Sequence, residues 1–193
     1  IRRDRRRCWW ARTAVANRRW WMRCSRCSCA PTFATSTSRL VPENGQSEFP
    51  QSVPLECWRA KAGHEAARTL GVKFGAPITI IRRMLKFSGK PVIIDEIYLP
   101  GEMFVGLDLE MLQSFQGSFY GLLETRFGVR MVHAEERIRA VAADQTNARL
   151  LGVAEGAPLL SVERVSYTYA DRPVEWRRGL YATAEHYYLN DLN

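Results

Sequence analysis

The sequence predicts an α+β domain in which helices flank an antiparallel sheet. Three observations carry this prediction. The pattern Leu-Gly-Val-x-x-Gly-Ala-Pro occurs at residues 70–77 and 151–158, and an arginine follows each proline by six residues. A short apolar run follows each copy, and a polar connection then leads to a second apolar run that begins with Pro-Val. We interpret this as two related helix–turn–hairpin units, an internal two-fold repeat in one domain, since a solenoid needs at least three copies.

Each unit is predicted to begin with a helix. Residues 65–70 and 145–151 are helix-like, and each stretch ends at a glycine, Gly71 or Gly152. Glycine readily adopts the left-handed conformation that ends a helix. The second glycine and the proline of each copy then predict a turn before a strand, because proline is tolerated where a strand starts.

Each turn leads into a predicted hairpin. Residues 78–81 and 159–162 are β-prone apolar runs bounded by turn residues, as expected for buried strands. Residues 88–90 and 170–172 are short polar connections to the next strand. Connections of this length indicate antiparallel pairing.

The stretch between the two units predicts one helix and one strand. Residues 118–127 form the helix, which Gly128 closes, and residues 129–142 form a long strand. Together with the two units, these elements complete a mixed domain on an antiparallel sheet.

Length and composition set the outer bounds. A chain of 193 residues with 46% hydrophobic residues is enough for one domain with a core, and no apolar run approaches the length of a membrane span. The net charge of +8 lies wholly in residues 1–50, which hold eleven arginines and three acids (11 − 3 = +8). Residues 51–193 hold the other 17 basic (28 − 11) and 17 acidic (20 − 3) residues, so that part is neutral.

Residues 1–30 differ from the rest of the chain, with ten arginines, four tryptophans and four cysteines. Arginines interrupt every apolar stretch, which argues against a secretory signal. Cys24, Cys27 and Cys29 give at most half a zinc site, because no second pair or nearby His completes four ligands. Three accounts stay open: a disordered tail with unpaired thiols, a nucleic-acid-binding segment that uses charge and stacking, or GC-rich DNA read out of frame. We favour the third.

The domain organisation follows from this change in composition. Residues 35–54 are rich in Ser, Thr, Pro and Gly and are interpreted as a linker. We therefore expect residues 1–52 to be a disordered segment with a linker, and residues 53–193 to be the folded domain.

The motifs of the second part resemble a known family. They are LGVKFGAPITIIRR, GKPVIIDEIYLP, GSFYGLLETRFGV, AADQTNARLLGVAEGAPLLSVERVSY and RPVEWRRGLY. In this order and spacing they are similar to the UTRA domain, the effector-sensing half of GntR-type transcription regulators of the HutC subfamily. The resemblance covers about 140 residues, 53–193.

The resemblance implies a chorismate-lyase-like fold, a pocket for a small-molecule effector, a homodimer and a cytoplasmic transcription regulator. It also implies an N-terminal winged helix-turn-helix that binds DNA. Residues 1–50 carry no helix-turn-helix pattern, so this module is not recognisable in the chain.

Three candidate ligand-binding residues come from the first half of the domain. Ser118 stands at a predicted helix start behind Gly117, where backbone N–H groups favour anions; its alternative role is a plain N-cap. The resemblance makes Ser118 and Tyr120 hydrogen-bonding groups of the pocket. It also makes Arg83 the partner of an anionic group of the effector, whereas the alternative is a salt bridge to a neighbour such as Asp95 or Glu96. Leu85 stands where sugar-phosphate sensors carry a second arginine, which favours a smaller or less charged acid.

Three further candidates follow the same logic. Asp95 and Glu175 each follow a Pro-Val strand start, and the resemblance gives both the role of accepting hydrogen bonds from ligand hydroxyl or amino groups. Their alternative role is pairing with arginine or facing solvent. Tyr181 lies six residues after Glu175, so the two-residue period of a strand places both on one face.

Nothing in the sequence argues for catalysis, a metal or a cofactor. The three histidines are scattered, and no phosphate-binding glycine loop is present. Two rival hypotheses remain beside the regulator: a lyase on the same fold, which fold alone does not establish, and a nucleic-acid-binding protein that acts through its basic tail. The sequence does not identify the effector.

Overall fold

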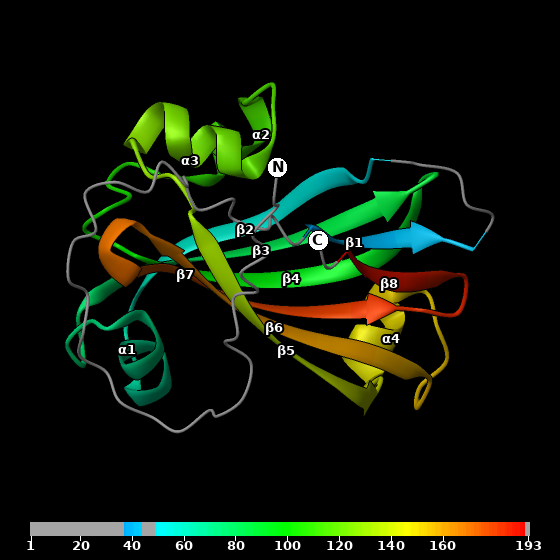
Figure 1. The fold of residues 1–193 in the computed structure, drawn as a ribbon. Coiled ribbons are helices and arrows are strands. Elements are labelled where there is room, and N and C mark those ends of the chain that lie inside the picture. Colours follow the sequence, from blue (N-terminus) through cyan, green and yellow to red (C-terminus); the bar gives the residue numbers. More distant parts are fainter. Residues whose placement is uncertain (1–36, 44–48, 192–193) are drawn as a thin grey trace, which may run out of the picture. The chain divides into compact units, whose positions relative to one another are not determined.

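A six-stranded antiparallel sheet in the order β2-β3-β4-β7-β6-β5 forms the body of the molecule (Figure 1). The computed structural model describes residues 37–43 and 49–191. Within them the elements run β1 (Thr37–Pro42), β2 (Gln51–Lys61), α1 (His64–Leu70), β3 (Pro77–Phe87), β4 (Lys90–Pro100), α2 (Leu109–Ser114), α3 (Phe119–Phe127), β5 (His133–Ala142), α4 (Gln145–Leu151), β6 (Pro158–Thr168), the 3-10 turn η1 (Tyr169–Asp171), β7 (Arg172–Ala182) and β8 (His186–Asp191). The predicted α+β class is confirmed.

The two copies of the repeated pattern have the same local geometry. Gly71 and Gly152 end α1 and α4 in the left-handed conformation, with φ of 63° and 69°. The second glycines, Gly75 and Gly156, have φ of 77° and 79°, so both turns need a residue that tolerates positive φ. Each helix is followed by a hairpin, β3–β4 or β6–β7, as the sequence predicts. An internal two-fold relation of the whole units stays a prediction.

Several elements differ from the sequence prediction. Thr37–Pro42 lies within the predicted linker of residues 35–54 but is a strand that pairs antiparallel with β8 in a separate two-stranded ribbon. β5 begins at His133 rather than at residue 129, because Val129 packs into the core after the helix cap. The short helix α2 was not predicted. Residues 1–36 lie outside the described part, so the domain boundary near residue 52 stays a prediction.

The two faces of the sheet are covered by different elements. On the face that we call face A, Ile81 and Ile97 pack beneath Leu122 of α3. Farther along the same face, Ile93 and Tyr181 pack against the β1–β8 ribbon. Face A therefore carries α2 and α3 toward one end of the strands and the ribbon toward the other (Figure 1).

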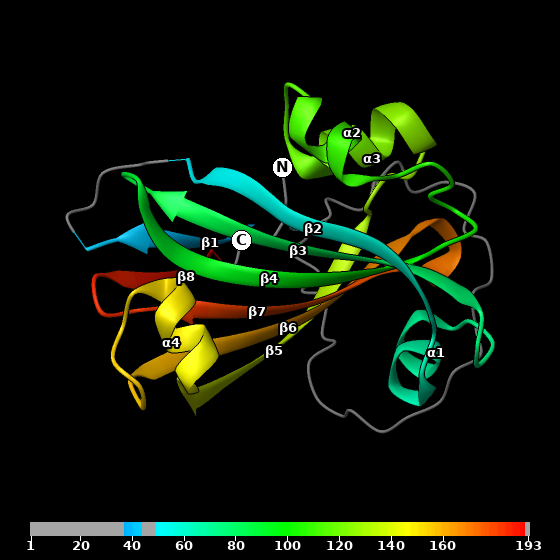
Figure 2. The same cartoon turned by 180° about the vertical axis from the view of Figure 1, so that it is seen from behind.

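The opposite face, face B, carries α1 and α4. Ile80 packs with Ala66 and Leu70 of α1, whereas Ile94 packs with Leu151 of α4. Figure 2 shows these two helices near opposite ends of the strands. Each face thus has two apolar clusters with a strip between them, and polar side chains occupy both strips.

The longest described helix, α3, has nine residues, and no helix in residues 37–43 and 49–191 has the length and apolar character for a membrane crossing. Within the same residues, no group of three or more His, Cys, Asp or Glu side chains is arranged to hold a metal ion.

Candidate functional site

Arg83 and Asp95 form a buried ion pair in the strip on face A. They are direct partners in the register of β3 and β4, so their side chains leave the sheet on the same face. Arg83 Nε and Nη2 lie 3.0 Å and 2.8 Å from Asp95 Oδ2, and the side chains are 8% and 1% exposed. The Arg83 guanidinium also lies 5.0 Å from the centre of the Phe119 ring. A ligand that uses Arg83 must therefore compete with Asp95.

Glu175 is fully buried on the same face and is held by hydroxyl groups. The single proton of the Tyr120 hydroxyl is shared between the two carboxylate oxygens, which lie 3.1 Å (Oε2) and 3.3 Å (Oε1) from the hydroxyl oxygen. The Ser166 hydroxyl donates to Oε2 over 2.5 Å, from the residue directly opposite on β6. Burial raises the pKa of Tyr120 above its usual value, so the phenol stays protonated and can donate.

Arg177 lies between these two groups, two residues after Glu175 on β7. Its Nη1 is 3.7 Å from Asp95 Oδ2, a longer contact than the one made by Arg83. Burial by itself lowers the pKa of the Arg177 guanidinium, but Tyr120, Asp95 and Glu175 around it raise this pKa well above the usual value. Among the described residues, two buried side-chain atoms lack a hydrogen-bond partner, namely Arg177 Nε and Asp95 Oδ1.

Ser118 has the geometry of a helix N-cap. Its Oγ accepts a hydrogen bond from the backbone N–H of Gly121 over 3.0 Å at the start of α3. The cap places Tyr120 in the first turn of the helix, above Glu175. Ser118 thus positions Tyr120, and this is the alternative role given in the sequence analysis.

Tyr181 closes the strip on the side of the β1–β8 ribbon. It is buried with Leu40 of β1 and Tyr188 of β8, and burial raises its pKa above the usual value. A Cβ added at Gly179 would lie 2.6 Å from the Tyr181 ring and 2.8 Å from Asp95 Oδ1. The absence of a side chain at this position therefore allows Asp95 and Tyr181 to approach β7.

Arg164, at the place in the second unit that matches Arg83, is paired with Glu136 of β5. Its Nε donates to Glu136 Oε1 over 2.5 Å, and the Tyr188 hydroxyl also donates to Glu136. This pair joins β5, β6 and β8.

The structure thus brings five of the six predicted residues onto face A as an ion pair, a carboxylate–phenol pair and a flanking tyrosine. Ser118 borders them through the start of α3. Sequence analysis missed Arg177 and Ser166. The two-residue period of a strand places Arg177 on the face of Glu175 and was the signal that could have identified it. Ser166 carries no such signal, because only the pairing of β6 with β7 brings it to Glu175.

A small cavity opens on face A beside this group. It measures about 120 Å³ and is lined in part by Arg83, Phe119 and Gly117. Arg83 both lines the cavity and binds Asp95, so its guanidinium lies between the cavity and the buried acid.

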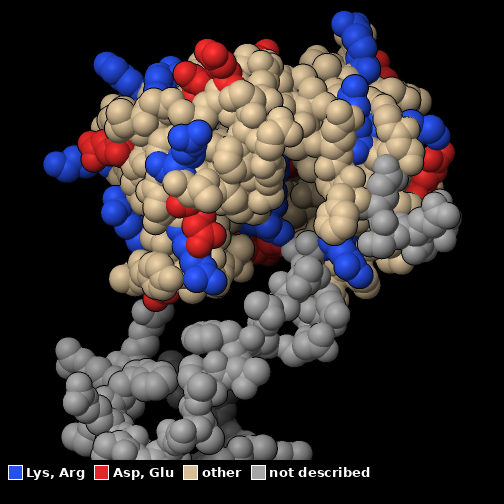
Figure 3. All heavy atoms as spheres, turned by 90° about the horizontal axis from the view of Figure 1, so that it is seen from above, with Lys and Arg blue, Asp and Glu red and all other residues tan. Residues whose placement is uncertain are grey.

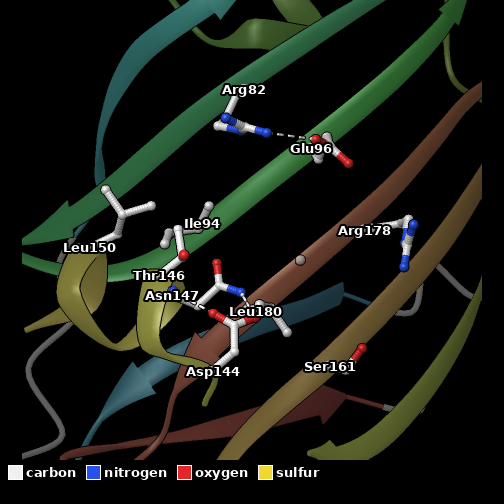
Figure 4. Close-up of a pocket in the computed structure, with 11 residues that line it drawn as sticks. Arg82, Ile94, Glu96, Asp144, Thr146, Asn147, Leu150, Ser161, Arg178 and Leu180 are labelled. Atoms are coloured by element: carbon white, nitrogen blue, oxygen red, sulfur yellow. Dashed lines mark hydrogen bonds and ion pairs between the residues drawn. The ribbon is translucent and has the colours of Figure 1, made fainter. Parts of the chain in front are cut away.

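Face B carries a different arrangement, a row of alternating charges across all six strands. Direct register partners form this charge ladder, in the order Glu56, Arg82, Glu96, Arg178, Glu163 and Arg137. A larger cavity of about 370 Å³ separates the middle of the ladder from α4 (Figure 4). Of its charged lining residues, Arg82 binds Glu96 over 3.1 Å and Asp144 caps α4 through Asn147. Arg178 lies 5.7 Å from the centre of the Trp176 ring. None of the predicted site residues lines it.

The surface carries both signs of charge. Figure 3 shows basic and acidic side chains interspersed over the described residues in that view. This agrees with the neutral balance of residues 51–193 and differs from the basic stripe that phosphate backbones require.

Comparisons with known proteins agree with one another. The model of the UTRA domain family matches residues 46–187. The HTH-type transcriptional regulator Rv0792c of Mycobacterium tuberculosis is 33% identical over 129 residues, 65% of this chain and 46% of its own length. The HTH-type transcriptional repressor PhnF of Mycolicibacterium smegmatis is 31% identical over 128 residues, 66% of this chain and 51% of its own length. The chain therefore spans about half the length of these relatives.

A solved structure from Bordetella bronchiseptica, described as the ligand-binding domain of a GntR-family transcriptional regulator, has a TM-score of 0.76 and 48% sequence identity. The match covers 80% of this chain and 96% of that one. Fold, motif order and relatives lead to one assignment: the chain belongs to the UTRA domain family.

Proposed function

We propose that this chain senses a small polar effector on face A and thereby regulates transcription. The observation that carries the proposal is the set of buried polar groups around Asp95 and Glu175, which includes two charged side chains with an unsatisfied atom. Buried polar atoms are normally satisfied, and exceptions tend to mark functional sites. A ligand that enters this strip supplies the missing partners.

The regulator is further proposed to be a cytoplasmic homodimer of the HutC subfamily. A winged helix-turn-helix binds DNA, and effector binding changes the spacing of the two DNA-binding modules and hence operator affinity. The names of the relatives support this proposal, as they are HTH-type regulators. Light scattering of the purified chain should give the mass of a dimer, and a strict monomer at high concentration would contradict it.

The rival hypothesis, a lyase on the same fold, has less support. Cys57 borders the core beneath face A, where burial raises the pKa of its thiol, whereas a nucleophilic cysteine needs a lowered pKa. Arg83 and Asp95 neutralise each other rather than activating a third group. Incubation with chorismate separates the hypotheses, because a lyase releases pyruvate and a sensor leaves the compound unchanged.

The test of the proposal is a thermal-shift screen of the chain against small acids, amino acids, sugars and their phosphates, followed by calorimetry of the best compound. Arg83→Ala should weaken its binding roughly 30-fold or more, since truncating one partner of a buried charge pair costs about 2–5 kcal/mol. Arg164→Ala is the control, because Arg164 pairs with Glu136 and should affect the melting temperature more than the affinity. Unchanged affinity in Arg83→Ala would contradict the site assignment.

A further inference from the structure

Arg177 is the least satisfied charge on face A. Its side chain is 8% exposed, Nε has no hydrogen-bond partner, and its contact with Asp95 Oδ2 is 3.7 Å long. Arg83, by contrast, directs two donors at Asp95 within 3.0 Å. A buried guanidinium that is only partly paired lowers the stability of the fold. A ligand that completes the pairing removes this penalty, which favours binding.

Asp95 has an unused hydrogen-bond acceptor, where Arg177 has an unused donor. Oδ2 accepts both bonds from Arg83, whereas Oδ1 is buried and without a partner. Arg177 contacts this same carboxylate, so the vacant acceptor and the vacant donor belong to groups in contact. A molecule that satisfies both must carry a donor for Asp95 Oδ1 and an acceptor for Arg177 Nε.

The formal charges on face A limit the class of ligand further. Three guanidinium groups and three carboxylates lie in the strip, which gives 3 − 3 = 0; they are Arg83, Arg164, Arg177, Asp95, Glu136 and Glu175. A phosphate ester brings roughly −1.5 to −2 charges at neutral pH and finds no surplus cation here. Leu85, two residues after Arg83 on β3, adds none.

We propose that Arg177 and Asp95 are the specificity-determining pair of the site and that the effector is a small zwitterion. Its carboxylate binds Arg177 Nε and its ammonium group binds Asp95 Oδ1. Glu175 and Tyr120 border the ligand beside Arg177. The inference rests on the proposed function and adds the chemical class of the effector.

The cavity on face A is lined by Arg83 but by neither Asp95 nor Arg177, so the proposal requires a side-chain movement. A ligand that enters it meets Arg83 first, and the Arg83 guanidinium has to turn from Asp95 toward the ligand carboxylate to expose Asp95, so Arg83 contributes to binding beside Arg177. Asp95 stays compensated during this movement, because Arg177 contacts the same carboxylate oxygen. The cavity of about 120 Å³ corresponds to roughly four water volumes, so the probes should be small.

The experiment uses the whole chain with three families of matched probes. Glycine, β-alanine and γ-aminobutyrate are the zwitterions, their hydroxy-acid analogues lack the ammonium group, and their amides lack the carboxylate. We expect at least one zwitterion to raise the melting temperature and, in calorimetry, to bind about tenfold or more tightly than its two analogues.

Two variants of Arg177 test the residue itself. Arg177→Met should weaken binding of the best zwitterion by roughly 30-fold or more, and Arg177→Lys should weaken it to a similar extent because lysine lacks the planar donors of the guanidinium. Arg177→Lys keeps the charge balance, so it stays informative if Arg177→Met fails to fold. Arg178→Met is the matched control: Arg178 is the next residue but lies in the ladder on face B, and its loss should change affinity less than about twofold.

Three results would overturn the inference: binding of no zwitterion, equal binding of a hydroxy acid or an amide, or undiminished affinity in Arg177→Lys. Other results distinguish failure of this inference from failure of the proposed function. If a sugar or phosphate from the wider screen binds and Arg177 variants bind it equally well, the sensor survives and this inference falls. If no compound of any class binds, both fall.

Discussion

The two faces of the sheet carry the same chemistry in different surroundings. Arg82 and Arg83 are neighbours on β3, and each pairs with one of the neighbours Glu96 and Asp95 on β4. The nitrogen–oxygen distances are similar, 3.1 Å on face B and 2.8 Å on face A. Exposure differs, because the face B side chains are 39% and 28% exposed and the face A side chains are 8% and 1% exposed.

The difference shows that pair geometry alone does not indicate a binding site. In the ladder, an inner charge such as Glu96 has an opposite charge on each side, Arg82 and Arg178, and water reaches the row. On face A the charges are removed from water and their pairing is incomplete. For this reason we place the proposed ligand site on face A, where two buried charged side chains each keep an unpartnered atom, rather than on the water-exposed ladder of face B.

The largest expected effect is a difference in stability between substitutions of Asp95 and of Glu96. Asp95→Ala leaves two buried arginines without their carboxylate and should lower the free energy of unfolding by about 3–5 kcal/mol. Glu96→Ala, the neighbour on face B, should lower it by about 1 kcal/mol or less. Urea denaturation measures both, and equal losses would remove the distinction between the faces.

The next effect concerns close approach on face A. Gly179→Ala places a methyl group within 2.6 Å of the Tyr181 ring and 2.8 Å of Asp95 Oδ1, so it should cost about 1–3 kcal/mol through overpacking. Gly63→Ala is the control, since its added Cβ meets nothing within 4 Å. A melting temperature unchanged by Gly179→Ala would show that Asp95 and Tyr181 are less tightly placed than described.

The third effect is a dependence on pH. Burial alone raises the pKa of Glu136, but the hydrogen bond from Tyr188 and the charge of Arg164 lower it below the usual value of 4.5. The folded carboxyl then binds its proton less tightly than the unfolded one, so its contribution is present above about pH 4.5 and is lost as the pH falls through the folded pKa. Glu136→Gln and Arg164→Met should both flatten the acid side of the stability curve. A parent-like slope in both variants would contradict this assignment.

The smallest effect is a difference in salt sensitivity. Arg82→Met removes an exposed ladder charge and should cost less than about 1 kcal/mol at low salt, a loss that shrinks further as salt screens the row. The loss in Asp95→Ala should persist at the same salt concentration, because buried pairs are screened less. Denaturation at two salt concentrations compares them, and parallel behaviour would argue for equal exposure of the two faces.

Sequence analysis predicted what local patterns and strand periodicity encode. Both hairpin units, the αL glycines and α3 with its cap at Ser118 follow from short-range signals, and the shared face of Glu175 and Tyr181 follows from the two-residue period. For Arg83 the sequence allows either ligand binding or a salt bridge to a neighbour such as Asp95 or Glu96, and the structure shows the bridge to Asp95. Which oxygen of Asp95 stays vacant depends on packing that no sequence pattern reports.

Elements that depend on distant partners were not predicted. β1 gains its strand conformation by pairing with β8, which lies almost the whole domain away in sequence, and its composition is that of a linker. α2 has six residues and no buried residue, so it lacks the apolar period that identifies longer helices. Arg177 was missed although the two-residue period places it on the face of Glu175, because its contact with Asp95 depends on the pairing of β7 with β4.

The β1–β8 ribbon packs directly against one of the residues proposed to bind the effector. Leu40 of β1 and Tyr188 of β8 pack in one cluster with Tyr181, at the border of the site. β1 is also the first described strand, and the chain enters the domain through it. The proposed site is therefore in direct contact with β1 through Tyr181 and Leu40, so a ligand that moves Tyr181 should also shift this strand.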